Sequence, residues 1–480
     1  MGNRCVFGIR LVALLLASSG MLHAETLNIA KLKNYANQAI PAFVTKDNSA
    51  HYTLTDEGAT LGRVLFYDKK LSTTNTVSCA SCHRQESGFS DSAAKSVGVG
   101  GETPRHAMRL INIRYASETN YFWDERAASL EEQTTQPIKD HIEMGYSGLD
   151  GHPDIDDLIA KLEGLDYYPP LFDLAFGDPA ITESRMQLAL GQFVRSIQSF
   201  DSKYDVGRAQ VATNLDELPN FTHEENLGRY LFVEEMDIVT GEAEVPGPDG
   251  PVTMTVALRL GGGMGCASCH QPPEFDIDPE SLNNGNSLGV GGAHDYSVTR
   301  SPSLRNIFNP AGELNGPLFH NGAVTEVDGI MAHYNFQEID PENTNLDPRL
   351  TLEGLPLFLD VAPYEERQIL AFLRTLSGSD VYTNEKWSDP FDASGNLVLS
   401  NELRIDALYY SASAGEVSFE LSSRPGATYT LWTSSDLSAD GWSVFQSGIQ
   451  ADSASFRTLV GPFPVSDSRR SYFRVSEEVP

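Results

Sequence analysis

The hydrophobic pattern changes once along the chain. Up to residue 382, apolar positions recur at helical spacing, as in FVRSIQSFD at 193–201 and FLRTLSGSD at 372–380. After residue 382, short runs such as GEVSFELSS and TYTLWTSS alternate apolar and polar residues between turn residues. The pattern predicts a mainly α protein that ends in an all-β, sandwich-like module.

Two parts of the helical region repeat one another. LGRVLFYDKK at 61–70 corresponds to LGRYLFVEEM at 227–236, and CASCH occurs unchanged at 79–83 and 266–270. The repeat predicts two homologous domains in tandem. The expected segments are a signal peptide at 1–24, domains at 25–205 and 206–382, and a β-module at 383–480.

The second copy carries an insertion between LGR and CASCH. Residues 237–263, DIVTGEAEVPGPDGPVTMTVALRLGGG, place a Pro/Gly turn between two β-prone runs. This predicts a hairpin-like insertion, either a surface loop or a docking element. The β-module contains no Cys or His, so a binding or packing role is expected for it.

The N-terminal segment and the charge indicate an exported protein. Arg4 and Arg10, a short apolar run and Ala24 give the layout of a cleaved secretory signal, with a membrane anchor as the alternative. We therefore expect a periplasmic protein with no membrane span after cleavage. The formal charge of −32 argues against nucleic acid as a partner. Such a negative charge would suit binding to a basic electron-transfer partner. The alternative explanation is that it serves solubility alone.

The chemistry of the chain is expected at the two CASCH segments. C-x-x-C-H is the attachment signature of c-type haem, in which the thiols form thioethers and the histidine binds the iron. A zinc site would need further Cys or His at regular spacing, and a redox disulfide would need a βαβ setting. The sequence predicts two covalent haem c groups, attached through Cys79, Cys82, His83, Cys266, Cys269 and His270.

The opposite face of each iron decides the function. No His or Met follows His83 until His106, which we interpret as a packing residue, with an iron ligand as the alternative. Gln133, Pro137 and Glu143 are expected on one proline-interrupted helix. An amide and a carboxylate over an open iron can move a peroxide proton between the two oxygens. His51, His152, His223 and His294 are interpreted as surface or structural residues.

Several motifs in order resemble those of the bacterial di-haem cytochrome c peroxidase family, within it the MauG-like subgroup. They are LGRVLFYDKKLSTTNTVSCASCH, NYFWDERAASLEEQTTQPI, EMG, TRSPSLRNIFNP, LFHNGAVTEVDGIMAHYN and ILAFLRTLSG. The resemblance implies that hydrogen peroxide reacts at the first haem. It gives Glu143 the acid–base role, Gln133 and Pro137 places in the distal pocket, and Trp123 electron transfer between the haems.

The resemblance also implies ligands that the chain partly changes. The sixth ligand of the second iron falls on Tyr334, with Met331 and His333 as alternatives. The loop after the first motif lacks the histidine that closes the iron in typical peroxidases, so we expect an open iron. His106 replaces an asparagine that helps hold calcium between the haems, which leaves a Ca²⁺ ion as a possibility only.

The expected function is an exported di-haem peroxidase. Its reductant would be a small cytochrome or cupredoxin, or an oxidisable protein side chain. Two alternatives stay open at this point: an electron carrier with both irons six-coordinate, and a chain whose β-module binds a surface or polymer.

Overall fold

The computed structural model describes most of the chain. The described residues are 27–477, apart from 30, 51, 248–249, 290–291, 337–338, 401–404, 412–413, 415, 424, 435–441, 453–454 and 465–471. The predicted signal peptide at 1–24 and His51 therefore lie outside the described residues. Within the described ranges no helix is both long and apolar enough to cross a bilayer.

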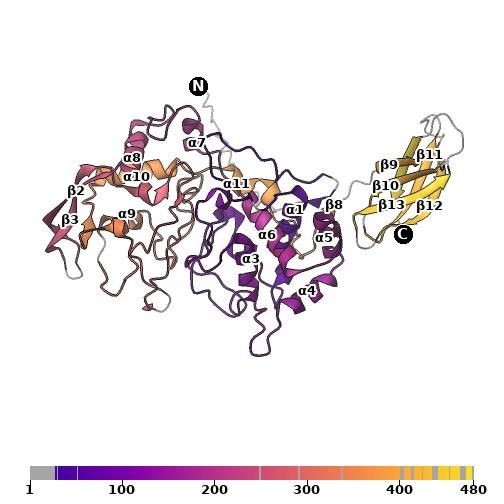
Figure 1. The fold of residues 1–480 in the computed structure, drawn as a ribbon, viewed down its shortest axis with the longest axis horizontal. Helices are drawn as coiled ribbons and strands as arrows, with labels where there is room; N and C mark the ends of the chain where they lie inside the picture. Colours follow the sequence, from indigo (N-terminus) through magenta and orange to yellow (C-terminus); the bar gives the residue numbers. More distant parts are fainter. Residues whose placement is uncertain are drawn as a thin grey trace, which may run out of the picture.

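The first half of the helical region is built from short helices around one hydrophobic cluster. α1 (Asp56–Tyr67) packs against α6 (Glu183–Ser196), which also covers α3 (Leu130–Lys139) (Figure 1). The remaining helices here are α2 (Cys79–Cys82), α4 (Ile155–Glu163), α5 (Tyr168–Phe176) and α7 (Lys203–Arg208).

The second half has its own cluster. α8 (His223–Val233) packs against α10 (Pro363–Arg374), and α9 (Asp328–Asn335) lies nearby (Figure 1). The helices α6 and α10 end within the predicted segments 193–201 and 372–380, at Ser196 and Arg374.

The LGR glycine of each repeat performs the same structural task. Gly62 lies where α1 crosses α6, and a Cβ there would overlap the carbonyl oxygen of Ala189. Gly228 lies where α8 crosses α10, and a Cβ there would overlap the carbonyl oxygen of Gln368. Backbones this close leave no room for a side chain, so each crossing requires glycine.

The predicted insertion is a β-hairpin, as expected. β2 (Met236–Val245) pairs antiparallel with β3 (Val252–Gly262) along nearly its whole length. β3 continues into a four-stranded sheet of order β2-β3-β7-β6 through β7 (Leu355–Phe358) and β6 (Thr351–Leu352). The hairpin forms one end of the molecule in Figure 1.

The chain after the second cluster returns to the first. Beyond α11 (Asp380–Thr383), Trp387 and Phe391 are buried in the first cluster, and Trp387 Nε1 donates to Ser196 O over 3.1 Å. β8 (Leu399–Ser400) pairs in parallel with β1 (Leu27–Asn28). Residues 383–400 therefore pack on the first cluster before the strands of the C-terminal sheets begin.

The C-terminal β-sheets are confirmed. Two three-stranded sheets, β13-β10-β9 and β12-β11-β14, share one apolar cluster that includes Phe419 and Leu431. Figure 1 shows this module as a separate lobe. The strands are β9 (Ile405–Ser411), β10 (Glu416–Ser422), β11 (Thr428–Ser434), β12 (Ser443–Gln450), β13 (Arg457–Pro464) and β14 (Tyr472–Glu477).

Gly62→Ala should destabilise the protein by about 2 kcal/mol or more, because the added methyl overlaps backbone of α6. Thermal unfolding followed by circular dichroism should show a Tm at least ~4 °C below that of the unmodified protein. The control is Gly164→Ala at the end of α4, where the nearest atom to the new Cβ is 3.5 Å away. An unchanged Tm for Gly62→Ala would contradict the close crossing.

Candidate functional site

The first CASCH segment presents its histidine at the end of a single helical turn. Cys79 and Cys82 begin and end α2, and the His83 N–H donates to Cys79 O over 2.9 Å. His83 Nδ1 lies 3.3 Å from Phe89 O, so Nδ1–H is held by the backbone and Nε2 stays available. Burial lowers the pKa of His83 to about 4, which keeps the imidazole in the neutral form that binds metals.

A large cavity adjoins this segment and gathers the predicted distal residues. It holds about 2020 Å³ of empty space, including the part that opens to solvent. Cys79, Cys82 and His83 line it, and so do Gln133, Pro137, Glu143 and Trp123. The structure therefore brings all seven first-site residues predicted from the sequence to one cavity.

Glu143 reaches this cavity from a turn, so its predicted place on the proline-containing helix is wrong. α3 carries Gln133 and Pro137 but ends at Lys139. Asp140 Oδ1 then accepts the N–H groups of Ile142 and Glu143 over 2.8 and 3.0 Å, which turns the chain. Gly98 packs against this turn, where a Cβ would overlap Ile142 O.

The surroundings of Glu143 raise the pKa of its carboxyl, which makes it an unusually weak acid for a glutamate. Burial raises the pKa of Glu143 to about 7, and the nearby Asp140 carboxylate adds to the effect. Arg126, which also lines the cavity, opposes it. A carboxyl with this pKa can take up and release a proton near neutral pH.

His106 lies at the cavity wall with both ring nitrogens engaged. Its Nδ1 is 3.0 Å from Ala93 O, and its Nε2 is 3.2 Å from Ser90 Oγ. The ring is only 5% exposed. These contacts agree with the packing role expected from the sequence.

The second CASCH segment is presented differently. Gly265 adopts a left-handed conformation (φ 65°), a 3-10 turn spans Cys266–Ser268, and His270 starts the short strand β4 (His270–Gln271), which pairs with β5 (Asp276–Ile277). Burial lowers the pKa of His270 to about 4, and its buried Nδ1 has no hydrogen-bond partner.

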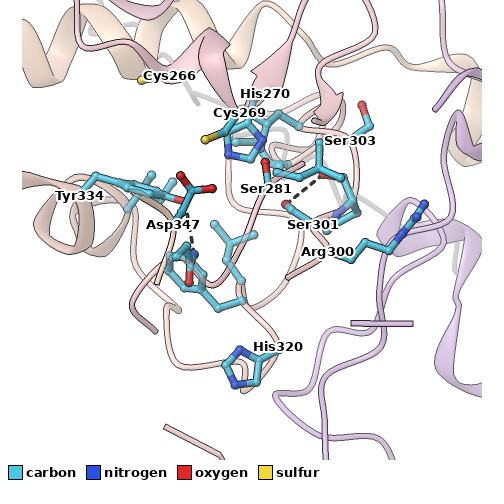
Figure 2. Close-up of a pocket in the computed structure, with 18 of the residues that line it drawn as sticks. Cys266, Cys269, His270, Ser281, Arg300, Ser301, Ser303, His320, Tyr334 and Asp347 are labelled. Atoms are coloured by element: carbon cyan, nitrogen blue, oxygen red, sulfur yellow. Dashed lines mark hydrogen bonds between the residues drawn. The ribbon is translucent and has the colours of Figure 1, made fainter. Parts of the chain in front are cut away.

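A second cavity of about 1640 Å³, again counting open solvent, adjoins Cys266, Cys269 and His270. Tyr334 and Met331 of α9 line it, and Figure 2 shows the Tyr334 side chain reaching toward the side that carries Cys269 and His270. The Tyr334 hydroxyl accepts a long hydrogen bond of 3.5 Å from Asn284 Nδ2, and burial raises the Tyr334 pKa to about 12.

His333 is not among the residues that line the second cavity. Its Nε2 lies 3.2 Å from Asn284 O. Of the three ligand candidates named from the sequence, the structure thus brings Tyr334 and Met331 to the cavity. The choice between these two stays a prediction.

Trp123 is part of the wall that separates the two cavities, because it lines both. Its Nε1 donates to His106 O over 2.8 Å, and its carbonyl oxygen accepts the N–H groups of Thr299 and Arg300 over 3.0 and 3.1 Å. Trp123 is therefore held by both halves of the helical region, its indole by His106 and its backbone by Thr299 and Arg300.

The two cavities fit covalently attached haem. Cys79, Cys82, Cys266 and Cys269 are free thiols at the cavity edges, each pair followed by a buried neutral imidazole. Among the described residues, no group of three or more His, Cys, Asp or Glu side chains is arranged to hold a metal ion alone.

Sequence reasoning missed several residues of these cavities. His294, interpreted as an ordinary residue, lines the first cavity, and Met236, Met264, Arg109 and His320 line the second. Met236 and Met264 flank the inserted hairpin, so the insertion itself was the only local signal that could have indicated them.

Comparison with known proteins matches the chain to a family. The family model described as di-haem cytochrome c peroxidase matches residues 56–211. The methylamine utilization protein MauG of Methylorubrum extorquens is 29% identical over 334 residues, which cover 67% of this chain and 79% of that protein. The cytochrome c551 peroxidase of Nitrosomonas europaea is 26% identical over 382 residues, which cover 76% and 91%.

A solved structure supports the same assignment. A MauG-like protein associated with microbial copper homeostasis aligns with a TM-score of 0.55 and 26% identity, covering 74% of this chain and 99% of that chain. The motifs, the paired cavities and these relatives agree. Residues 56–211 match the di-haem cytochrome c peroxidase model, and over about two thirds of its length the chain is similar to cytochrome c peroxidases and to the MauG proteins.

Proposed function

We propose that this chain is an exported, periplasmic di-haem peroxidase that reduces hydrogen peroxide at the first cavity. Cys79, Cys82 and His83 would hold one haem, and Cys266, Cys269 and His270 the other, so that each tandem domain carries one. The observation that supports this most strongly is the convergence of Gln133, Pro137 and Glu143 on the cavity of the first CASCH segment.

When bound, the first haem supplies an iron that takes peroxide and the electrons that reduce it. Glu143 accepts the first proton of hydrogen peroxide and returns it to the oxygen that leaves as water. The balanced reaction consumes one peroxide, two electrons and two protons and gives two waters. A carboxyl with a pKa of about 7 suits both halves of this transfer.

The other two distal residues shape the space around this proton transfer. The Gln133 amide offers both a donor and an acceptor to the peroxide oxygens. Pro137 has no N–H and presents an apolar ring, which limits the hydrogen bonds available beside Glu143. His106 is already paired with Ala93 and Ser90, so it leaves the first iron open.

Electrons would reach the first site through Trp123 from the second haem. Tyr334 is the proposed sixth ligand there, as the resemblance to MauG-like peroxidases implies; it lines the cavity, as Met331 also does, and His333 does not. An anionic oxygen ligand favours higher oxidation states of iron, so the second site would store oxidising equivalents. The final reductant would be a small basic cytochrome or cupredoxin, or an oxidisable protein side chain, and nucleic acid is not a partner.

Glu143→Gln should slow the reaction with hydrogen peroxide by roughly 10²–10⁴-fold, because the base is lost. In the unmodified protein the rate should fall as pH drops below about 7, since the raised pKa leaves Glu143 protonated there. Stopped-flow spectra from pH 5 to 9 measure both effects. Glu163→Gln, at an exposed acid of α4, is the control. A Glu143→Gln variant with the full rate and pH profile would contradict the role.

Trp123→Phe should slow electron transfer between the two haems at least ~10-fold, because the indole of the shared wall is removed. Rapid reduction of the second haem followed by optical detection of the first measures this rate. Trp387→Phe is the matched control, since that buried indole lines neither cavity. Equal rates in the two variants would show that electrons take another route.

Tyr334→Phe should change the optical and EPR spectra of the second haem and leave those of the first unchanged. Met331→Leu should leave both unchanged, because the proposed ligand is the tyrosine. The reverse result, with a spectral change in Met331→Leu alone, would assign the ligand to Met331 and give the second haem a higher potential.

A further inference from the structure

A buried arginine faces the second cavity without a counterion. Arg109 lines that cavity and is 6% exposed. Its only described hydrogen bond is a long one of 3.4 Å from Nη1 to Ser303 O, and its buried Nε has no partner. No carboxylate among the described residues forms an ion pair with it, and burial lowers its pKa to about 10.

Comparison of the two sequence repeats shows that only the first copy has an arginine at this position. Asn112 and Asn306 occupy equivalent left-handed positions (φ 61° and 56°), and their side chains donate to Ser199 O and Gly378 O, near the closing segment of each copy. Arg109 stands three residues before Asn112, where the second copy has Ser303. Arg109 thus donates a hydrogen bond to Ser303, the residue at the equivalent position of the second copy.

A second buried nitrogen without a partner lies in the same cavity. His320 is 2% exposed, and its Nε2 has no hydrogen-bond partner. Its ring packs edge-on to Trp123, with 6.3 Å between ring centroids. Figure 2 shows His320 across the cavity from Cys269 and His270.

Other polar groups of this cavity have different tasks. Arg300 also lines it, but its guanidinium donates to the carbonyl oxygens of Glu118 and Asn120, in the first half of the chain. Asp347 is engaged with Arg349. Arg109 is therefore the guanidinium with the least hydrogen bonding here: its one described bond is long, whereas Arg300, whose Nε is also unpartnered, donates to two carbonyl oxygens.

A buried guanidinium without a counterion indicates an anionic ligand. A guanidinium does not lose its proton in a protein, so its burial costs free energy unless an anion pairs with it. Carboxylates suit the fork of an arginine because they accept two parallel hydrogen bonds. Haem carries two propionate carboxylates on one edge of the macrocycle.

We propose that Arg109 forms a carboxylate-binding subsite for a propionate of the second haem. This rests on the proposed occupancy of the second cavity by haem. The positive charge of Arg109 offsets that propionate, which favours the reduced haem and raises its potential relative to an unpaired one.

The test is potentiometry of the full-length protein with both haems attached, with optical and EPR detection of each haem. Arg109→Gln should shift the equilibrium of the second haem toward the oxidised form by at least ~10-fold, about 59 mV for one electron. Arg109→Lys should restore most of the original potential, because it keeps the positive charge. The potential of the first haem should stay unchanged.

Arg229→Gln is the matched control. Arg229 is also buried with an unpartnered Nε, but it contacts Asn214 O and Leu215 O and lines neither cavity. An unchanged second potential in Arg109→Gln, with both haems attached, would overturn the subsite. A protein that attaches no haem at Cys266 and Cys269 would instead refute the proposed function on which the subsite rests.

Discussion

Four hydrogen bonds around Trp123 join the segments that line the two cavities. Trp123 Nε1 donates to His106 O, His106 N–H donates to His320 O, and Trp123 O accepts from Thr299 and Arg300. Three of these bonds link residues of the first half of the chain to residues of the second. The distance between the two candidate haem sites is set by them, and transfer of electrons between the sites depends on that distance.

The two sites share an anchor and differ in what surrounds it. The first cavity contains an amide, a proline and a carboxyl whose pKa is near neutral, a set suited to moving protons. The second cavity is lined by methionine side chains and by Tyr334. The guanidinium of Arg109, which has no counterion among the described residues, lies at its boundary. The repeated sequence segments, with different side chains around them, agree with the proposed division of labour between peroxide chemistry and electron handling.

Short sequence patterns predicted the elements whose formation depends on neighbouring residues. The CASCH segments, the inserted hairpin and the C-terminal strands follow from short motifs and periodicity, and Gln133 and Pro137 share a helix as expected. Glu143 left that helix because Asp140 caps a turn, a competition between side-chain and helical hydrogen bonds. The return of Trp387 to the first cluster and the orphaned Arg109 depend on contacts between distant segments, which no local pattern encodes.

The most direct test is the EPR and optical spectrum of the diferric protein before and after one equivalent of hydrogen peroxide. An open first haem beside Glu143 and a six-coordinate second haem predict one high-spin and one low-spin signal, with the high-spin signal lost rapidly on addition of peroxide. Two low-spin signals that do not respond to peroxide, even after half reduction, would contradict the account and indicate an electron carrier.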